Sequence, residues 1–354
     1  MKKIIQNNVW SITSFIENKE YNFDKKKILE HLPEKFIDEA IEAISTWDNY
    51  IPTPLLKLNK LNDELKLNNI YYKDEDKRFE LKSFKALGGA FAVYKIANEN
   101  KNITVSTATA GNHGRSVAWG AQRLGLKCKI FISEFVSETR AEAMCNLDAE
   151  VIRVKGNYDN SLKECIEQSN KNNWEIVQDV SWEGYKEVPK LIMAGYTIMV
   201  KEIIDKVDKN SITHVFLQAG VGGMAAAMIA GFAKLSKNIP KFIIVEPENA
   251  DCVFQSIKNN KPTTVDIKKE TVMGGMSCGD VSSIAWEILK NSANCCLTIP
   301  DEAISTAVAL LAEARLSDEK IIGGECAVPG VIALIGSFNN KEYLDKLKID
   351  AKSN

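Results

Sequence analysis

The stretch HVFLQAGVGGMAAAMIAGFAKL (214–235) contains a complete strand, turn and helix. Residues 214–220 read as a buried strand, the glycines of GVGGM (220–224) indicate a turn, and the alanine-rich remainder predicts a helix. KFIIVEPE (241–248) then reads as a second strand. A helix between two strands is typical of a parallel sheet with crossover helices, so this stretch predicts an α/β fold.

The same alternation runs through the preceding part of the chain. Strands are expected over 103–108, 128–133, 150–156 and 174–180, helices over 116–125, 138–147 and 160–171, and a long amphipathic helix from Pro189 to about Val207. Ligands of such sheets bind beyond the carboxyl ends of the strands. Three turns are therefore candidate sites: AGNHG (110–114), QDVSWEGY (178–185) and AGVGG (219–223).

Bulk properties limit the kind of partner. A chain of 354 residues exceeds what one hydrophobic core usually supports, so two lobes are expected. A formal charge of −2 argues against a nucleic-acid footprint or a polybasic membrane patch, and favours a small-molecule partner. MKKIIQNNVW (1–10) does not read as a secretory signal, and no apolar run is long enough to span a bilayer, so a cytoplasmic protein is expected. The three histidines are far apart in sequence, so no metal site is predicted.

The glycine turn at 220–224 is a candidate phosphate site. Glycines between a strand and a helix let backbone N–H groups converge on an anion, and the helix dipole adds favourable potential. The alternative is a tight turn whose small residues permit close packing. The turn is neither a Walker-type motif nor a G-x-G-x-x-G motif.

Two further turns carry candidate polar groups. Asn112 and His113 lie between an expected strand and helix, where an amide binds a ligand or, alternatively, stabilises its own turn, and His113 is equally compatible with a structural role. Asp179 closes an expected buried strand, where its pKa would be perturbed, or it caps the next turn.

Lys85 lies in KSFKALGGA (82–90), an apolar frame followed by two glycines. An amine that forms a Schiff base must lose its proton, which a partly desolvated pocket promotes. Most lysines are solvated surface groups, so Lys85 alone indicates nothing. A lysine, an asparagine in a strand-to-helix turn and a glycine phosphate turn together meet the needs of pyridoxal phosphate (PLP), which presents an aldehyde, a phenolic oxygen and a phosphate.

These motifs resemble those of the fold-type-II PLP-dependent enzymes, and most closely those of the diaminopropionate ammonia-lyases. The resemblance runs from YIPTPLLKLNKL (50–61) to IGGECAVPGV (322–331). The S-F-K and G-N-H elements are shared with serine and threonine dehydratases. The elements N-H-G-R-x-V-A-W, Q-D-x-x-W-E-G-Y and E-P-x-x-A-x-C distinguish the ammonia-lyases, and all three are present.

The resemblance implies a role for each matching residue. Lys85 would carry the cofactor and act as a base, and Asn112 would contact the phenolic oxygen. Asp179 would be a catalytic residue near the substrate that protonates the leaving β-amino group. The phosphate would be bound by Gly220, Val221, Gly222, Gly223 and Met224, and the substrate by Ala110, Gly111 and His113. It further implies a smaller lobe of residues 88–195, a larger cofactor-binding lobe of 1–87 and 196–354, and a homodimer.

Two positions depart from the family pattern. The ammonia-lyases read T-D-G-N-H-G where this chain has Ala110, and their aspartate is linked to handling the D-isomer, so weak turnover of D-2,3-diaminopropionate is expected. The alanine resembles the dehydratases. KLKIDAKSN (346–354) supplies no further strand with a Ser or Thr hydroxyl for the pyridine nitrogen.

The leading hypothesis is α,β-elimination of 2,3-diaminopropionate, with preference for the L-isomer, to pyruvate and ammonia. An L-serine or L-threonine dehydratase is the first alternative, because it uses the same machinery with a hydroxyl leaving group. A PLP-binding protein with reduced or no catalysis is the second, because of the missing terminal strand.

Overall fold

The computed structural model describes residues 9–100, 102–109, 111–208 and 211–354, and the chain divides into two compact units. Unit 1 comprises Met1–His31, Thr53–Asp74 and Met199–Asn354, and unit 2 comprises Leu32–Pro52 and Glu75–Ile198. This division differs from the predicted lobes, because residues 32–52, 75–87 and 196–198 belong to unit 2.

Aromatic packing explains why residues 32–52 join unit 2. The Trp47 ring lies 5.8 Å from that of Trp119. The Arg123 guanidinium lies over both rings, 4.6 Å from the centroid of Trp47 and 4.7 Å from that of Trp119. Cation–π contacts of this kind stabilise a pair by about 0.5–1 kcal/mol at exposed sites. These contacts hold residues 32–52 in unit 2, whereas the sequence alone predicts that they belong to the larger lobe with the rest of residues 1–87.

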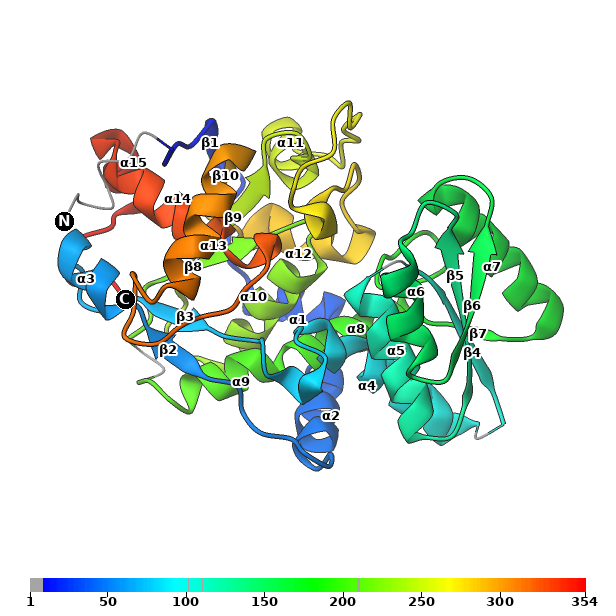
Figure 1. The fold of residues 1–354 in the computed structure, drawn as a ribbon. Coiled ribbons are helices and arrows are strands. Elements are labelled where there is room, and N and C mark those ends of the chain that lie inside the picture. The colour runs from blue at the N-terminus through cyan, green and yellow to red at the C-terminus, as the bar shows by residue number, and fades with distance from the viewer. Residues whose placement is uncertain (1–8, 101, 110, 209–210) are drawn as a thin grey trace. The chain divides into compact units, whose positions relative to one another are not determined.

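Unit 2 contains a four-stranded parallel sheet with the order β6-β5-β4-β7. The strands are β4 (Thr104–Ala108), β5 (Lys127–Ser133), β6 (Ala149–Val154) and β7 (Glu175–Ile176). Figure 1 shows α7 (Tyr158–Asn172) on one side of this sheet and α5 (Asn112–Arg123) and α6 (Glu138–Cys145) on the other. Buried residues of β4, β5 and α7 form a small core beneath α7: Ala108, Phe131 and Cys165.

Four further helical elements belong to unit 2, and one of them, α4 (Lys85–Glu99), packs against its neighbours through glycines. The other three are α2 (Glu34–Ser45), the 3₁₀ turn η2 (Arg78–Glu80) and α8 (Glu187–Tyr196). A Cβ on Gly88 of α4 would come within 2.6 Å of the Ile192 carbonyl oxygen in α8, and one on Gly89 would come within 2.6 Å of Ser116 Oγ in α5. The two glycines behind Lys85 therefore let α4 lie directly against two other helices.

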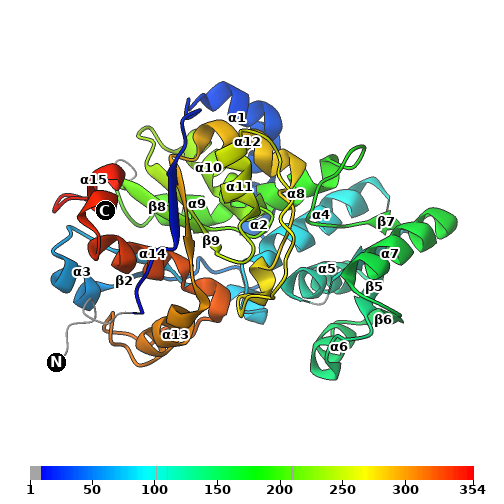
Figure 2. The ribbon, with the colours of Figure 1, turned by 90° about the horizontal axis from the view of Figure 1, so that it is seen from above.

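Unit 1 is built on a four-stranded sheet with the order β1-β10-β9-β8. The strands are β1 (Ser14–Glu17), β8 (His214–Gln218), β9 (Lys241–Pro247) and β10 (Cys295–Ile299). β8, β9 and β10 are parallel, and β1 pairs antiparallel with β10, Ser14 opposite Thr298. Figure 2 shows α13 (Ile304–Ala312) and α14 (Pro329–Phe338) on one side of these strands and α10 (Gly223–Leu235), α11 (Cys252–Asn259) and α12 (Ser283–Ser292) on the other.

The smaller elements of unit 1 complete its covering layers. They are α1 (Lys25–His31), the hairpin of β2 (Leu55–Lys57) and β3 (Tyr71–Lys73), α3 (Asn59–Leu65), α15 (Lys341–Leu347), and the 3₁₀ turns η3 (Gly274–Met276), η4 (Asp301–Ala303) and η5 (Glu325–Ala327). Among the described residues that follow β10, none lies in a strand.

The α/β class with mostly parallel sheets is confirmed, and two predicted elements differ from the structure. The strand expected over 174–180 is limited to β7, so Asp179 lies beyond the strand that it was expected to close. The long helix expected from Pro189 to about Val207 is interrupted, and α9 (Ile198–Ile204) is a separate helix. The cause lies at Thr197, whose backbone N–H and hydroxyl both donate to the Ala194 carbonyl, at 3.0 and 2.6 Å. These bonds tighten the last turn of α8. None of the helices formed by the described residues has the length and apolar character needed to cross a membrane.

Candidate active site

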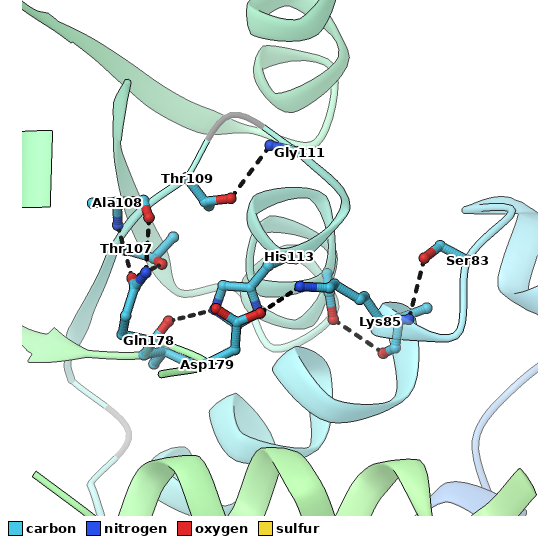
Figure 3. Close-up of polar contacts among 12 residues, drawn as sticks. Ser83, Lys85, Thr107, Ala108, Thr109, Gly111, His113, Gln178 and Asp179 are labelled. Atoms are coloured by element: carbon cyan, nitrogen blue, oxygen red, sulfur yellow. Dashed lines mark hydrogen bonds and ion pairs between the residues drawn. The ribbon is translucent and has the colours of Figure 1, made fainter. Parts of the chain in front are cut away.

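Lys85 and Asp179 form a close ion pair in unit 2. Lys85 is the first residue of α4, and its backbone N–H donates to Ser83 Oγ at 3.2 Å. Its Nζ donates to Oδ2 of Asp179 at 2.6 Å. The side chains are 31% and 15% exposed, so the pair is largely removed from water. Figure 3 shows the Lys85 and His113 side chains reaching Asp179 from two different helices.

Gln178 fixes the segment that carries Asp179. Its side-chain oxygen accepts hydrogen bonds from Thr107 Oγ1 at 2.8 Å and from the Ala108 N–H at 3.1 Å. Its side-chain nitrogen donates to the Ala108 carbonyl at 2.9 Å. Gln178 is fully buried, so these bonds are protected from water. They hold Asp179 at the carboxyl end of β4, where α/β proteins place ligands.

The charge of Asp179 follows from its neighbours. Burial acts to raise the pKa of this carboxyl, but the His113 ring where it is protonated, the Lys85 ammonium and the hydrogen bond from Lys85 outweigh it. The net effect is a pKa below the usual range of an aspartate. Asp179 is therefore an ionised carboxylate at neutral pH.

His113 lies on the other side of Asp179 and is only 2% exposed. Its Nε2 lies 2.8 Å from the Val177 carbonyl oxygen, which only accepts hydrogen bonds, so Nε2 carries a proton. Its Nδ1 lies 3.8 Å from Asp179 Oδ2 and has no hydrogen-bond partner among the described residues. Burial is the main cause that lowers the pKa of His113, so the neutral ring has a bare Nδ1 that faces the carboxylate.

Tyr196 adds a further polar group near the Lys85–Asp179 pair. Its ring packs edge-on against Phe84, with centroids 5.0 Å apart, and lies against Gly88. Burial raises the pKa of Tyr196, with smaller effects of Lys85 and Asp179, so the phenol stays protonated. Its hydroxyl is buried and has no hydrogen-bond partner in the described part of the chain. Such groups are rare in native proteins and commonly mark a place that a ligand or water satisfies.

The predicted turn beyond β4 supplies exposed polar groups. Gly111 is the N-cap residue of α5, and because glycine has no side chain, no side-chain hydrogen bond caps this end of the helix. Asn112 is exposed, and its side chain makes no hydrogen bond to its own turn within the described residues. The amide is therefore available to a ligand. Ala110, predicted to contact the substrate, lies outside the described residues.

The glycine turn of unit 1 has the features of an anion site. Gly222 adopts φ +87° and precedes α10, whose N-terminus has no side-chain cap. The first N–H groups of a helix have no intrahelical partner and attract anions. A Cβ on Gly223 would meet no atom within 4 Å, so its surroundings are open. A Cβ on Gly222 would come within 2.8 Å of Leu289 Cδ1, so close packing also requires a glycine there.

Each unit, taken by itself, has groups that suit one part of a cofactor with an aldehyde and a phosphate. Lys85 offers an amine in partly desolvated surroundings, Asn112 offers an amide, and the N-terminus of α10 offers backbone donors without a competing cap. Two buried atoms beside Lys85, Nδ1 of His113 and the hydroxyl of Tyr196, have hydrogen-bonding capacity that the described protein atoms do not use.

The sequence and the fold together define the class. Residues 46–346 match the family model of pyridoxal-phosphate dependent enzymes, and the helix-flanked parallel sheets are those of fold type II. The chain is a PLP-dependent enzyme of this family. Within the family it belongs to the diaminopropionate ammonia-lyases.

The relatives agree on this placement. Diaminopropionate ammonia-lyase from Escherichia coli strain K12 is 33% identical over 336 residues, which cover 89% of this chain and 84% of that protein. The crystal structure of the Escherichia coli enzyme in complex with an aminoacrylate–PLP azomethine reaction intermediate matches with a TM-score of 0.87 and 32% identity, over 97% of this chain and 92% of that chain. A biosynthetic L-threonine dehydratase from Haemophilus influenzae is 30% identical over 211 residues, 60% of this chain and 39% of that protein.

Sequence reasoning missed two residues of the site. Tyr196 was part of a family-like motif, IMAGYTIM (192–199), but no local signal indicates that its hydroxyl lies near Lys85. Gln178 is the second residue. The one sequence signal for its role is that its amide lies at the end of an expected buried strand, where it can hold the segment before Asp179 by hydrogen bonds to β4.

Proposed function

We propose that the protein uses PLP to eliminate ammonia from 2,3-diaminopropionate, with preference for the L-isomer. The products are pyruvate and two molecules of ammonia, one from the β-amino group and one from hydrolysis of the aminoacrylate. The observation that carries the proposal is the Lys85–Asp179 pair, an amine 2.6 Å from a carboxylate in a partly desolvated site.

Lys85 has the role of covalent anchor and base. When bound, PLP accepts the electron pair that remains on the substrate Cα after its proton is removed. Lys85 Nζ, in its neutral form, removes that proton from the L-isomer. Its position at the start of α4, fixed by the bond from its N–H to Ser83 Oγ, supports this role because a base must be held in place relative to the proton.

Asp179 has the role of binding the leaving group. The second amino group of 2,3-diaminopropionate is an ammonium at neutral pH, and an ionised, partly desolvated carboxylate favours a cation over a neutral hydroxyl. An ammonium leaves directly as neutral ammonia, so no further proton donor is required. The depressed pKa of Asp179 supports this role instead of the protonation of the leaving group by Asp179.

The remaining predicted residues have binding roles in the proposal. Backbone groups of the turn Gly220, Val221, Gly222, Gly223 and Met224 bind the phosphate, and Asn112 binds the phenolic oxygen. Gly111 and His113 lie at the substrate, together with Ala110. The family resemblance supports a homodimer in the cytoplasm, which light scattering of the purified protein and cell fractionation test.

A dehydratase that acts on L-serine or L-threonine is the second candidate. Ala110 favours it, because the residue resembles the dehydratases at this position. The L-threonine dehydratase relative also matches over 60% of this chain. The leaving group separates the two functions, since a dehydratase releases water from the β-carbon.

An absorption spectrum tests the proposal. Purified protein with PLP should show a protein-bound cofactor band, and addition of L-2,3-diaminopropionate should produce pyruvate. Lys85→Ala should lose both. Lys95→Ala is the matched control on the same helix, because Lys95 Nζ pairs with Glu39 at 2.8 Å, away from Asp179, and it should retain both.

The substrates decide between the candidates. Faster pyruvate formation from L-serine, or 2-oxobutyrate formation from L-threonine, than pyruvate formation from L-2,3-diaminopropionate would favour the dehydratase. A cofactor band without turnover of any of the three would contradict both functions.

A further inference from the structure

One oxygen atom of Asp179 faces two nitrogen atoms from different helices. Oδ2 lies 2.6 Å from Lys85 Nζ in α4 and 3.8 Å from His113 Nδ1 in α5. The His113 ring is held in place by its Nε2, which donates to the Val177 carbonyl at 2.8 Å. The three groups therefore form a chain from the amine, through one carboxylate oxygen, to a buried imidazole nitrogen.

The His113–Asp179 contact lacks a proton in the neutral state of the ring. With Nε2 protonated, Nδ1 carries a lone pair, and it faces the lone pairs of an ionised carboxylate. A proton on Nδ1 would change this contact into a charge-assisted hydrogen bond. His113 is 2% exposed, so bulk solvent screens this contact little.

The charge of Lys85 determines whether Asp179 needs a proton on His113 Nδ1 as its partner. While Lys85 is an ammonium, Asp179 has a cationic partner at 2.6 Å, and a second positive charge on His113 would be repelled by Lys85. When Lys85 becomes neutral and no substrate ammonium is bound, Asp179 has lost that partner. The other titratable groups around the pair are the hydroxyls of Tyr196 and Tyr185, whose raised pKa values keep them protonated and uncharged.

We propose that His113 is a proton store for Lys85. The proton that leaves Lys85 Nζ passes through Asp179 Oδ2 to His113 Nδ1, and it returns when Lys85 takes up a proton again. One N–H bond of the ammonium breaks and one forms on the imidazole. The charge of the three groups together stays constant, so the buried site avoids the cost of an unpaired carboxylate.

The inference rests on the proposed function only in that the reaction needs a neutral Lys85. It makes His113 a positioning and proton-holding residue, in addition to its predicted place at the substrate. A lysine that serves as a base must be neutral at neutral pH, and a nearby acceptor for its proton is one way to achieve this.

Nitrogen NMR of the full-length, cofactor-free protein tests the coupling directly. The chain contains three histidines, so ¹⁵N-labelled imidazoles give few signals, and His113→Gln identifies the one of interest. In the wild type at neutral pH, the His113 ring is expected to be neutral with its proton on Nε2. In Lys85→Met, the pKa of His113 is expected to rise by about one pH unit or more, with the new proton on Nδ1. Lys85→Arg keeps the cation and should leave His113 neutral.

Two NMR results would overturn the proposal: a proton on Nδ1 instead of Nε2 in the neutral wild-type ring, or the same His113 pKa in Lys85→Met as in the wild type. Neither NMR result bears on the proposed function, which pyruvate formation by the wild type tests separately. Conversely, an absence of turnover leaves the NMR coupling intact.

Kinetics of His113→Gln give a second measurement. A glutamine retains an N–H donor for the Val177 carbonyl but has no titratable nitrogen near Asp179. The acid limb of the pH profile of kcat/KM is expected to move about one unit toward higher pH, a tenfold loss near neutrality that is recovered in alkaline buffer. A uniform loss at every pH would indicate a purely structural role and contradict the proposal.

Discussion

Gly88 lies directly against the ring of Tyr196, so that a Cβ on Gly88 would come within 2.5 Å of Tyr196 Cε1. The same Cβ would come within 2.6 Å of the Ile192 carbonyl oxygen, which belongs to the backbone of α8 and has little freedom to move. The contact joins α4, which begins at Lys85, to α8, which ends at Tyr196.

Gly88→Ala is therefore expected to destabilise the protein by about 1–3 kcal/mol, because the added methyl group forces α4 and α8 apart. Urea unfolding of the cofactor-free protein measures this difference. Gly274→Ala is the control, since a Cβ there meets no atom within 4 Å, and it should change stability by less than about 0.5 kcal/mol. Equal stability of the two variants would contradict the packing argument.

The stability supplied by Asp179 should depend on pH in a defined direction. Its folded-state pKa is lowered from 3.8, so its contribution is present above that value and is lost as the pH falls through the folded-state pKa. Near neutral pH, Asp179→Asn is expected to cost about 1–3 kcal/mol, and the cost should shrink as the pH falls below about 4. Urea unfolding of both proteins at a series of pH values measures it.

The control for this prediction is Glu183→Gln, which removes an exposed carboxylate from the same segment. It should cost little at any pH, as is usual for exposed charges. A cost of Asp179→Asn that stays constant down to acid pH would show that the carboxylate charge is not what stabilises the pair.

The glycine turn allows a test of charge without a change of shape. Gly223 begins α10 in open surroundings, so both Asp and Asn should fit there. Gly223→Asp is expected to bind PLP about tenfold or more weakly than Gly223→Asn, because its carboxylate opposes the phosphate and occupies the free N–H groups. Titration of the cofactor-free proteins by absorbance gives both dissociation constants. Equal affinities would mean that this turn does not bind the phosphate.

Ala110 gives a prediction about stereochemistry. A methyl group accepts no proton, so turnover of D-2,3-diaminopropionate should be weak in the wild type. Ala110→Asp is expected to raise kcat/KM for the D-isomer by about 100-fold, within the range of one general base, and to change that for the L-isomer far less. Pyruvate formation from each isomer measures the effect, with Ala110→Asn as the uncharged control. No gain on the D-isomer would count against the assignment of this position.

Local sequence patterns predicted the elements that alternate regularly. The strand expected over 103–108 corresponds to β4, and the helix over 160–171 lies within α7. The pairing of β1 with β10 was not predicted, because residues far apart in the chain leave no mark on local periodicity. The break at Thr197 was missed since it depends on one hydroxyl that donates to the backbone.

The sequence singled out several candidate residues of the site but not their arrangement. Family motifs singled out Lys85, His113 and Asp179, yet nothing in their spacing states that one oxygen of Asp179 faces both nitrogens. Tyr196 was missed because a buried tyrosine on a helix reads as core. Its unpartnered hydroxyl becomes visible only once the surrounding atoms are placed.

The order in which the chain is synthesised separates the two units in time. Both segments of unit 2 have been made by Ile198, whereas the sheet of unit 1 needs β10, with which β1 pairs. Domains generally fold as units, those nearer the N-terminus first, and contacts between distant residues form slowly. The Lys85–Asp179 pair would then form on the nascent chain before β10 has been synthesised. Until β10 is made, β1 would be an unpaired strand with exposed backbone groups.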